Sequence, residues 1–518
     1  MLNTFFTILM CAFRGRTVLA TLLLGGFGGL EWAESAEPVR PDVILINCDD
    51  LGWGDLSGYG STAISTPNID RMADEGLRLT SFYVAQPICT ASRAALMTGC
   101  YAHRVGLHQG VLRPNAIRGL AGEEVTLAEV LRDVGYATAM IGKWHLGFVE
   151  PFRPTDQGFD SYLGIYHNLD AHETVYFEDR RLPWIEQTEP SGTVDNTAIT
   201  KLYGDAAVRR CGIADERPMF LYLAHAFPHV PLGVADEFRG RSRGGLYGDS
   251  IEQIDHETGR LIEAVRGRMR RTGRQAIVIF TSDNGPSPIS SGSAGPFQGT
   301  KHTSWEGGLR VPFVIWGPGL IPSGRTSRGF VSSMDVLPSL AALVGGTLPS
   351  DRTVDGLDAS EVFFAASETS PRTEMLFHNG GGALQGLRSE AWKVRSVAGR
   401  PAMLFHLEKD PGEAHDLATK YPRRTKKMVA RAKELSAKLH REARPAGQRS
   451  DLAVPHSLSP VYDVTIGDLS PASIERAEQA AASGINVAAY VQNPESADEP
   501  TRRRLSRSGI PLRKTPVN

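Results

Sequence analysis

The chain has 518 residues, a length that predicts two or more domains because single hydrophobic cores rarely grow so large. Hydrophobic residues make up 41% of the sequence and charged residues 22%, which is ordinary for a soluble globular protein. The formal net charge of −2 provides no overall positive field, so composition gives no support for nucleic-acid binding, and recognition of any anion must be local.

The amino terminus has the pattern of a secretory signal peptide. Arg14 and Arg16 precede an apolar run over residues 17–30, and small residues follow at 33–35. The apolar run is short for a membrane span, and a polar segment follows it directly. We therefore expect residues 1–36 to be a signal peptide and the protein to be exported, either periplasmic or secreted, without a stable membrane span.

The five cysteines are too few for a disulfide scaffold in a chain of this length. Cys11 would leave with the signal peptide, and Cys48 lies in an apolar run that predicts a buried, small hydrophobic side chain. Cys89 stands out by its context. An inert buried thiol or a bridge to Cys100 is the simplest alternative for it.

From residue 43 to residue 316, apolar runs of strand length alternate with helical patterns. Strands are expected at 43–47, 137–141, 219–226, 276–280 and 311–316. Helices are expected at 66–76, 126–134 and 251–269. This alternation predicts an α/β fold with a large, mostly parallel sheet flanked by helices. We expect this fold to form a catalytic domain over residues 37–345.

Beyond residue 345 the segments become shorter and contain more turns. Residues 383–411 predict antiparallel strands with a turn at 410–412, and 421–443 predict a basic amphipathic helix. We expect a smaller C-terminal domain over residues 346–445, with an antiparallel sheet and a helix. Residues 446–518 are polar and end in a basic stretch, which predicts a flexible tail. Attachment of a polyanion or a partner is the alternative for this tail.

Acidic residues follow two of the predicted parallel strands. Asp49 and Asp50 come after the first strand, and Asp283 and Asn284 come after the strand at 276–280. Either pair alone is common turn material. Because ligands bind at the carboxyl ends of strands in such sheets, their joint placement predicts a metal site. Oxygen ligands suit a hard divalent cation such as calcium or magnesium, rather than zinc or copper.

A set of cationic or titratable side chains accompanies these acids: Arg93, Lys143, His145, His229, Lys301 and His302. Any one of them alone would be read as a solvated surface residue or a core histidine. Together with a metal ion, they would suit the transfer of a sulfuryl or phosphoryl group. Cations can hold the nonbridging oxygens, and a histidine can give a proton to the leaving oxygen near neutral pH.

The run from Cys89 to Gly99, CTASRAALMTG, resembles the type I (formylglycine-dependent) sulfatases, the arylsulfatase-like branch of the alkaline-phosphatase-like superfamily. Their signature is C-x-P/A-x-R, followed by a helical run and Thr-Gly. Further similar blocks follow in the family's order, at 142–147, 158–160, 228–231, 281–285, 301–312, 335–338 and 404–411. The resemblance extends from Asp42 to Ala443 and implies an alkaline-phosphatase-like fold.

The resemblance implies hydrolysis of sulfate esters to an alcohol and inorganic sulfate. In the family, a maturation enzyme oxidises the cysteine to formylglycine, whose aldehyde is hydrated to a geminal diol. One hydroxyl attacks sulfur and displaces the alcohol, and the other then drives elimination of sulfate. Ala91 stands where many members have proline, which leaves open the maturation enzyme that modifies Cys89. The resemblance implies that the substrate is a sulfate ester, with a sulfated glycan among the candidates.

The resemblance also assigns roles to the site residues. One calcium ion would be bound by Asp49, Asp50, Asp283, Asn284 and the modified Cys89. The catalytic residues would be Cys89, Arg93, Lys143, His145, His229 and Lys301. Arg93 would support the formylglycine, and Lys143 and Lys301 would hold the sulfate oxygens. His145 would bind and help to deprotonate the diol, whereas His229 would contact the bridging oxygen and, with Lys301, assist the leaving alcohol.

Two other functions remain as alternatives. A phosphodiesterase or phosphonate monoester hydrolase of the same superfamily can share the acids and even the formylglycine, because fold does not fix the reaction. The ligands for one metal ion, with no second histidine-rich metal site evident in the sequence, favour sulfate. The other alternative, an inactive sulfated-glycan-binding protein, is disfavoured by the complete set of metal-binding and cationic residues.

Overall fold

The computed structural model describes residues 40–113, 116–169 and 181–452, and the backbone of short strands at 464–465, 489–491 and 512–514. The predicted signal peptide lies outside the described residues. Within the part of the chain that is described, no helix has the length and apolar character needed to cross a membrane.

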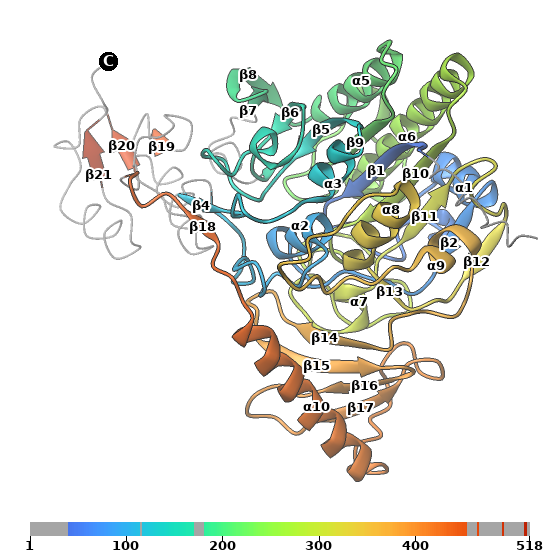
Figure 1. Cartoon of the computed structure of the whole chain (residues 1–518), viewed down its shortest axis with the longest axis vertical. Helices are drawn as coiled ribbons and strands as arrows, with labels where there is room; N and C mark the ends of the chain where they lie inside the picture. Colours follow the sequence, from blue (N-terminus) through green and yellow to red (C-terminus); the bar gives the residue numbers. More distant parts are fainter. Residues whose placement is uncertain are drawn as a thin grey trace, which may run out of the picture. The chain divides into compact units, whose positions relative to one another are not determined.

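A ten-stranded sheet forms the centre of the fold, in the order β12-β2-β11-β10-β1-β9-β5-β6-β7-β8 (Figure 1). The five inner strands are mutually parallel: β10 (Ala276–Ser282), β1 (Asp42–Cys48), β9 (Met219–Ala224), β5 (Ala137–Lys143) and β6 (Ser161–Ile165). The outer strands are β11 (Phe313–Trp316), β2 (Leu77–Leu79), β12 (Arg325–Ser327), β7 (Arg181–Glu186) and β8 (Glu189–Asp195). Antiparallel pairing joins both flanks to the parallel centre. The predicted α/β sheet is therefore confirmed.

Helices cover both faces of this sheet, because its inner strands are apolar on both sides. In β1, Ile44 and Ile46 pack with α1 (Pro67–Asp74), α5 (Ile199–Gly212) and α6 (Gly245–Thr272). Val43 and Leu45 point to the opposite face, which is covered by α2 (Cys89–Thr98), α3 (Leu127–Asp133), α8 (Val336–Val344) and α9 (Ser360–Ala365). The short helix α7 (Glu306–Leu309) is also buried. The result is a three-layer sandwich with a core on each side of the sheet.

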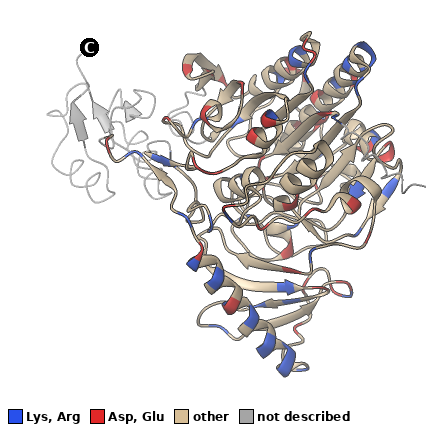
Figure 2. Ribbon diagram, in the orientation of Figure 1, with Lys and Arg blue, Asp and Glu red and all other residues tan. Residues whose placement is uncertain are grey.

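A second, four-stranded antiparallel sheet follows in the sequence. Its strands are β14 (Glu374–His378), β15 (Leu384–Ser389), β16 (Trp392–Arg395) and β17 (Met403–His406), in that order. The helix α10 (Pro422–Arg441) turns Met428, Ala432 and Leu439 into the core and leaves its basic side chains exposed, as Figure 2 shows. The predicted antiparallel sheet and helix are confirmed, and the structure adds β14, which the sequence analysis did not include.

The segment after α10 does not leave the fold at once. The Arg444 amide donates to the carbonyl of Arg104 at 2.7 Å, and β18 (Gly447–Gln448) pairs with β4 (Arg118–Gly119). Three short parallel strands follow, β19 (Val464–Thr465), β20 (Ala489–Val491) and β21 (Leu512–Lys514). The start of the C-terminal region expected to be flexible is thus held by backbone hydrogen bonds.

Candidate active site

The predicted acidic residues lie side by side at the carboxyl edge of the parallel strands. β1 pairs with β10 in a register that places Cys48 opposite Ser282, so Asp49 and Asp283 leave the sheet at the same level. Lys143 is the last residue of β5, and His229 follows β9. Neighbouring parallel strands therefore deliver carboxylates, an amine and an imidazole to one edge of the sheet.

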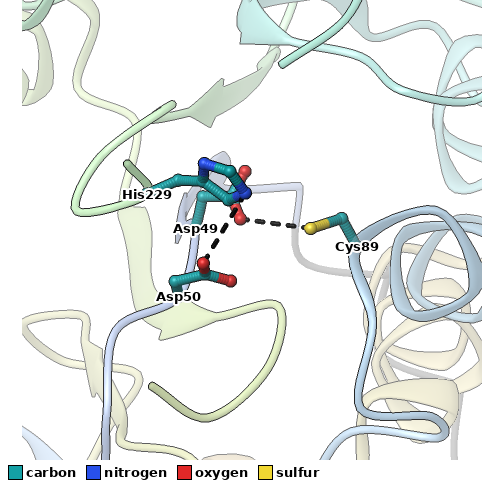
Figure 3. Close-up of side chains that lie close together, drawn as sticks. All are labelled: Asp49, Asp50, Cys89 and His229. Carbon is teal, nitrogen blue, oxygen red and sulfur yellow. Dashed lines mark hydrogen bonds and ion pairs between the residues drawn. The ribbon is translucent and has the colours of Figure 1, made fainter. Parts of the chain in front are cut away.

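Asp49 is the centre of the charged cluster. The Cys89 thiol donates to its Oδ1 atom at 3.3 Å (Figure 3), and Lys143 Nζ donates to its Oδ2 atom. Arg93 Nη2 lies 3.5 Å from the same Oδ2 atom. All four side chains are buried. Burial would raise the pKa of Asp49, but Lys143, His229 and Arg93 hold it well below its ordinary value.

Asp50 is held in a left-handed backbone conformation, with φ of +64°. Its Oδ1 atom accepts from Asn284 Nδ2 and lies beside Lys301 Nζ, each at 2.7 Å. His229 Nε2 lies 3.7 Å from the other oxygen, Oδ2 (Figure 3). Non-glycine residues rarely adopt this conformation, and they do so mainly where the surrounding structure enforces it. The backbone therefore turns the carboxylate of Asp50 into the cluster.

Arg93 links the two acidic pairs. Its Nε donates to Asp283 Oδ2 at 2.8 Å, and its Nη1 donates to the Lys143 carbonyl at 2.9 Å. It lies four residues after Cys89 in α2, so both side chains project from the same face of the helix. Burial and the neighbouring Asp49 raise the pKa of Asp283 to about 6. Arg93 opposes that rise and keeps the carboxylates together.

Cys89 is the first residue of α2, a helix whose ten residues are all buried. The unpaired amides and positive end of a helix N-terminus favour an anion at this position. Burial and the Asp49 carboxylate raise the pKa of the Cys89 thiol well above its ordinary value. As a thiol, Cys89 is uncharged at neutral pH and is a poor nucleophile. The described cysteines Cys48, Cys89, Cys100 and Cys211 are all free and buried, so the alternative bridge from Cys89 to Cys100 is absent.

The two predicted histidines have defined hydrogen-bond roles. His229 Nδ1 donates to the Val230 carbonyl at 2.5 Å, which leaves Nε2 to accept from Asn168 Nδ2 at 2.7 Å. His145 Nε2 donates to the Leu112 carbonyl at 3.1 Å, and its buried Nδ1 has no hydrogen-bond partner. Burial, reinforced by Lys143, lowers the pKa of His145 well below its usual range. His145 is therefore neutral, with the lone pair on Nδ1.

His302 and two residues absent from the sequence prediction complete the surroundings. His302 has φ of +72°, and its amide donates to the Pro87 carbonyl at 2.9 Å, which ties the segment after Lys301 to the one before Cys89. Asn168 orients His229, and Leu112 orients His145. Neither lies in a motif or a periodic segment, so no signal in the sequence marks them.

The residues present fit a hard metal ion. Asp49, Asp50, Cys89 and His229 offer ligand atoms that all lie within 4.8 Å of one another. Asp283 lies next to this group, because its Oδ1 atom accepts a hydrogen bond from the Asp50 amide at 3.4 Å. Asp50 Oδ2 and Asn284 Oδ1 are buried and have no hydrogen-bond partner, so both can act as ligands. A donor set made mainly of carboxylate and amide oxygens suits a hard divalent cation.

Comparisons with known proteins show the family to which the chain belongs. The Sulfatase family model matches residues 41–346. Arylsulfatase G of Canis lupus familiaris is 35% identical over 444 residues, covering 72% of this chain and 81% of the relative. N-acetylgalactosamine-6-sulfatase of the same species is 32% identical over 463 residues, covering 79% and 87%. Arylsulfatase A of Bos taurus is 36% identical over 454 residues, covering 77% and 86%.

Solved structures show the same fold. The PsFucS1 sulfatase from Pseudoalteromonas sp. superposes with a TM-score of 0.71 at 26% identity, covering 79% of this chain and 92% of that one. Ps i-CgsB in complex with k-i-k-neocarrahexaose gives a TM-score of 0.69 at 27% identity, covering 80% and 96%. The phosphonate monoester hydrolase of Agrobacterium radiobacter, at 21% identity and a TM-score of 0.57, covers 77% and 96% and shares the fold alone. The chain belongs to the sulfatase family and is a sulfuric ester hydrolase.

Proposed function

We propose that this sulfatase acts through a formylglycine made from Cys89 by a maturation enzyme, together with one bound calcium ion. The observation that carries the proposal is the position of Cys89. It begins a buried helix, lies 3.3 Å from Asp49 and faces the charged cluster at the edge of the sheet. The family signature from Cys89 to Arg93 supports the same conversion.

The metal ligands would be Asp49, Asp50, Asp283, Asn284 and the modified Cys89. Calcium, when bound, would draw electron density from a sulfate oxygen and offset the negative charge of the carboxylates. Formylglycine, when formed, would supply a hydrated aldehyde as the nucleophile. Arg93 has a positioning role, because its guanidinium contacts both Asp49 and Asp283 and holds the two ligands at a fixed spacing.

Two lysines of the charged cluster, Lys143 and Lys301, would bind the sulfate group. Lys143 reaches Asp49 and Lys301 reaches Asp50, and both ammonium groups are buried. Buried cations act strongly on the oxygens of a transferring group, because little water screens them. Burial alone would lower the pKa of Lys301, but Asp50 holds it well above the ordinary value. Lys301 is therefore positively charged throughout the neutral range.

The histidines would move the protons. His145 donates through Nε2 to a carbonyl, so its bare Nδ1 can accept a proton from a hydroxyl of the nucleophile. His229 keeps Nδ1 as a donor to Val230 and turns Nε2 toward Asp50. When protonated at Nε2, His229 can give that proton to the departing alcohol, with Lys301 beside the same oxygen. The tautomer that the Leu112 carbonyl imposes thus matches the role of His145 as a base, whereas His229 must first gain a proton at Nε2 to act as an acid.

For the substrate, we propose the sulfate ester of a sugar unit, met outside the cytoplasm. One relative is named N-acetylgalactosamine-6-sulfatase, and Ps i-CgsB was crystallised with k-i-k-neocarrahexaose. The signal-like residues 1–36 support export. Sulfate release from a panel of sulfated glycans would test the substrate class, and release from none of them would contradict it.

A decisive experiment combines mass and activity. The protein, co-expressed with a formylglycine-generating enzyme, should yield a peptide carrying residue 89 as the aldehyde. It should turn over an aryl sulfate faster than an aryl phosphodiester. Full sulfatase activity from protein that carries only the Cys89 thiol would refute the proposed role of formylglycine. Dominant phosphodiester turnover would instead favour a phosphodiesterase.

A further inference from the structure

The start of α10 carries a concentration of positive charge outside the candidate active site. Five exposed cations fall within eight residues: Lys420, Arg423, Arg424, Lys426 and Lys427. The sequence contains no acidic residue between Asp416 and Glu434. Figure 2 shows the basic side chains of the helix along its outer side. Because the whole chain has a formal net charge of only −2, this positive charge is a local feature.

Neighbouring carboxylates do not neutralise these five cations. The ion pairs that α10 forms within the described residues involve Arg431 and Lys438, which lie further along the helix. Like charges three or four residues apart repel each other on a helix, as Arg423 and Arg424 do with Lys427. Cations in the first turns of a helix also oppose its dipole. The arrangement weakens the isolated helix, which favours a role in binding an anion.

Two aromatic rings lie beside the cations. Tyr421 is 37% exposed, and Trp392 of β16 is half-buried. Their ring centroids are 5.3 Å apart, and the rings meet edge to face. The Arg424 guanidinium lies 4.3 Å from the centroid of Trp392, and Lys420 Nζ lies 5.5 Å from that of Tyr421. The same patch of surface therefore offers an exposed aromatic ring and several cations.

Arg424 is oriented by its contact with Trp392. A guanidinium stacks on an aromatic face and keeps its N–H groups free at its edge. Among the described residues, Arg424 has no hydrogen bond or ion pair, so its N–H donors remain available to a ligand. A planar group with free donors matches two oxygens of one anion. Arg424 is therefore an anion-binding group whose orientation is set before a ligand arrives.

We propose that this patch binds a sulfated sugar unit of a polysaccharide chain. We call it the Tyr421 surface, and it consists of Trp392, Lys420, Tyr421, Arg423, Arg424 and Lys427. The inference rests on the proposed function, because such a polymer carries the ester that the active site would hydrolyse. The C–H groups of a sugar ring pack on the negative face of an aromatic ring, and sulfate oxygens accept hydrogen bonds from guanidinium and ammonium groups. Binding one unit here would raise the concentration of other units of the same chain near the active site.

The fold disfavours an anionic membrane as the partner of this helix. Helices that lie on membranes insert their apolar face, but the apolar face of α10 packs into the core through Met428, Ala432 and Leu439. Among the described residues from 374 to 452, Tyr421 is the only large hydrophobic side chain that is exposed. A single exposed ring gives little area for insertion, whereas it suits contact with one sugar ring.

Binding to chondroitin sulfate and to dextran sulfate, each compared with its unsulfated counterpart, tests the Tyr421 surface. The full-length mature protein is prepared with the Cys89 thiol unmodified, so that the polymer is not consumed during the titration. At about 0.15 M salt, we expect at least one sulfated polymer to bind at least about tenfold more tightly than its unsulfated counterpart. Equal binding of the sulfated and unsulfated forms would overturn the proposal. Tighter binding to phosphatidylserine vesicles than to either sulfated polymer would overturn it too.

Matched variants locate the binding surface. Arg424→Gln/Lys427→Gln should weaken binding of the sulfated polymer at least about tenfold. Lys426→Gln/Lys433→Gln removes two exposed lysines from another side of the same helix and should weaken it less than about threefold. Tyr421→Leu, which keeps an apolar side chain, should weaken it about fivefold. Neither double variant should lower the thermal midpoint, because the removed charges repel their neighbours. Equal weakening by the two double variants would refute the Tyr421 surface.

Activity separates a failure of this inference from a failure of the proposed function. With formylglycine in place, Arg424→Gln/Lys427→Gln should turn over an aryl sulfate as the wild type does but show a higher KM for the sulfated polymer. An unchanged KM for the polymer would contradict the inference even where sulfate is released. Binding that depends on Arg424, Lys427 and Tyr421 without any sulfate release would instead support the Tyr421 surface and contradict the proposed substrate.

Discussion

Lys393 joins the small sheet to the main body through a buried ion pair with Glu306. It lies in β16, fully buried, with Nζ 2.8 Å from Glu306 Oε1 and 3.0 Å from Glu413 Oε1. Burial would raise the pKa of Glu306, but Lys393 and nearby arginines hold it below its ordinary value. Burial raises the pKa of Glu413, and Glu306 adds to that rise against the opposing Lys393. One ammonium group thus compensates two buried carboxyls.

The substitution Lys393→Met keeps the volume and removes the charge. Two carboxyl groups then remain buried without their shared cation, which should lower the free energy of unfolding by about 3–5 kcal/mol. Activity should fall as well. The Glu306 amide donates to Glu413 Oε2 at 2.7 Å, and Glu306 lies five residues after Lys301. Movement of Glu306 would displace the lysine that we assign to the sulfate oxygens.

Urea unfolding, followed by circular dichroism, measures the stability, and aryl sulfate turnover measures the effect on the site. Lys433→Met, which removes an exposed lysine of α10, is the matched control and should change stability by less than about 0.5 kcal/mol. The double variant Lys393→Met/Glu413→Gln should recover part of the loss, because one unpaired carboxylate is gone. A loss below about 1 kcal/mol in Lys393→Met would refute this account of the buried charges.

Three further outcomes follow from the site and the core. Cys89→Ala should lower sulfate-ester turnover by more than about 10³-fold with an unchanged thermal midpoint, and substantial residual activity would exclude Cys89 as the nucleophile's precursor. Chelation with EGTA should lower the thermal midpoint of the wild type but not that of Asp50→Asn, because only the wild type should hold the ion tightly. Equal shifts of the thermal midpoint in the two proteins would place calcium elsewhere. Burial lowers the pKa of His225 in the folded protein to about 4. As the pH falls, His225 therefore binds a proton in the unfolded state before it does so in the folded state, which favours unfolding. The free energy of unfolding should therefore decline by about 3 kcal/mol between pH 6.5 and pH 4 from this residue, and His225→Leu should lack that part of the slope in urea titrations.

The acidic part of the charged cluster was predictable because Asp49 and Asp283 follow strands whose apolar runs are continuous. The run at 43–47 became β1, and the run at 276–280 became β10, so parallel pairing alone brought Asp49 and Asp283 together. The ends of the helices and strands were harder to predict from the sequence. The helix expected from 251 begins at Gly245, because glycines at 244, 245 and 248 obscure the helical pattern there. β9 ends at Ala224, two residues before the expected end.

Contacts between distant segments lay beyond the sequence. The rings of His103, His108, His378 and His440 lie near one another in the fold, although these residues are spread from residue 103 to residue 440 in the sequence. Lys393, Glu306 and Glu413 likewise looked like ordinary charges, because burial and pairing depend on how the small sheet docks.

The complete burial of α2 bears on the timing of the proposed maturation. The Cys89 side chain is 1% exposed and the other nine residues of the helix are buried too, so no second protein can enclose it once the fold is closed. Under the proposed chemistry, the modifying enzyme must therefore act on the chain before it folds. A polypeptide that folds first would be trapped with its thiol, stable and well formed but permanently inactive. The yield of active enzyme would then depend on the rate of Cys89 modification relative to the rate of folding during biosynthesis.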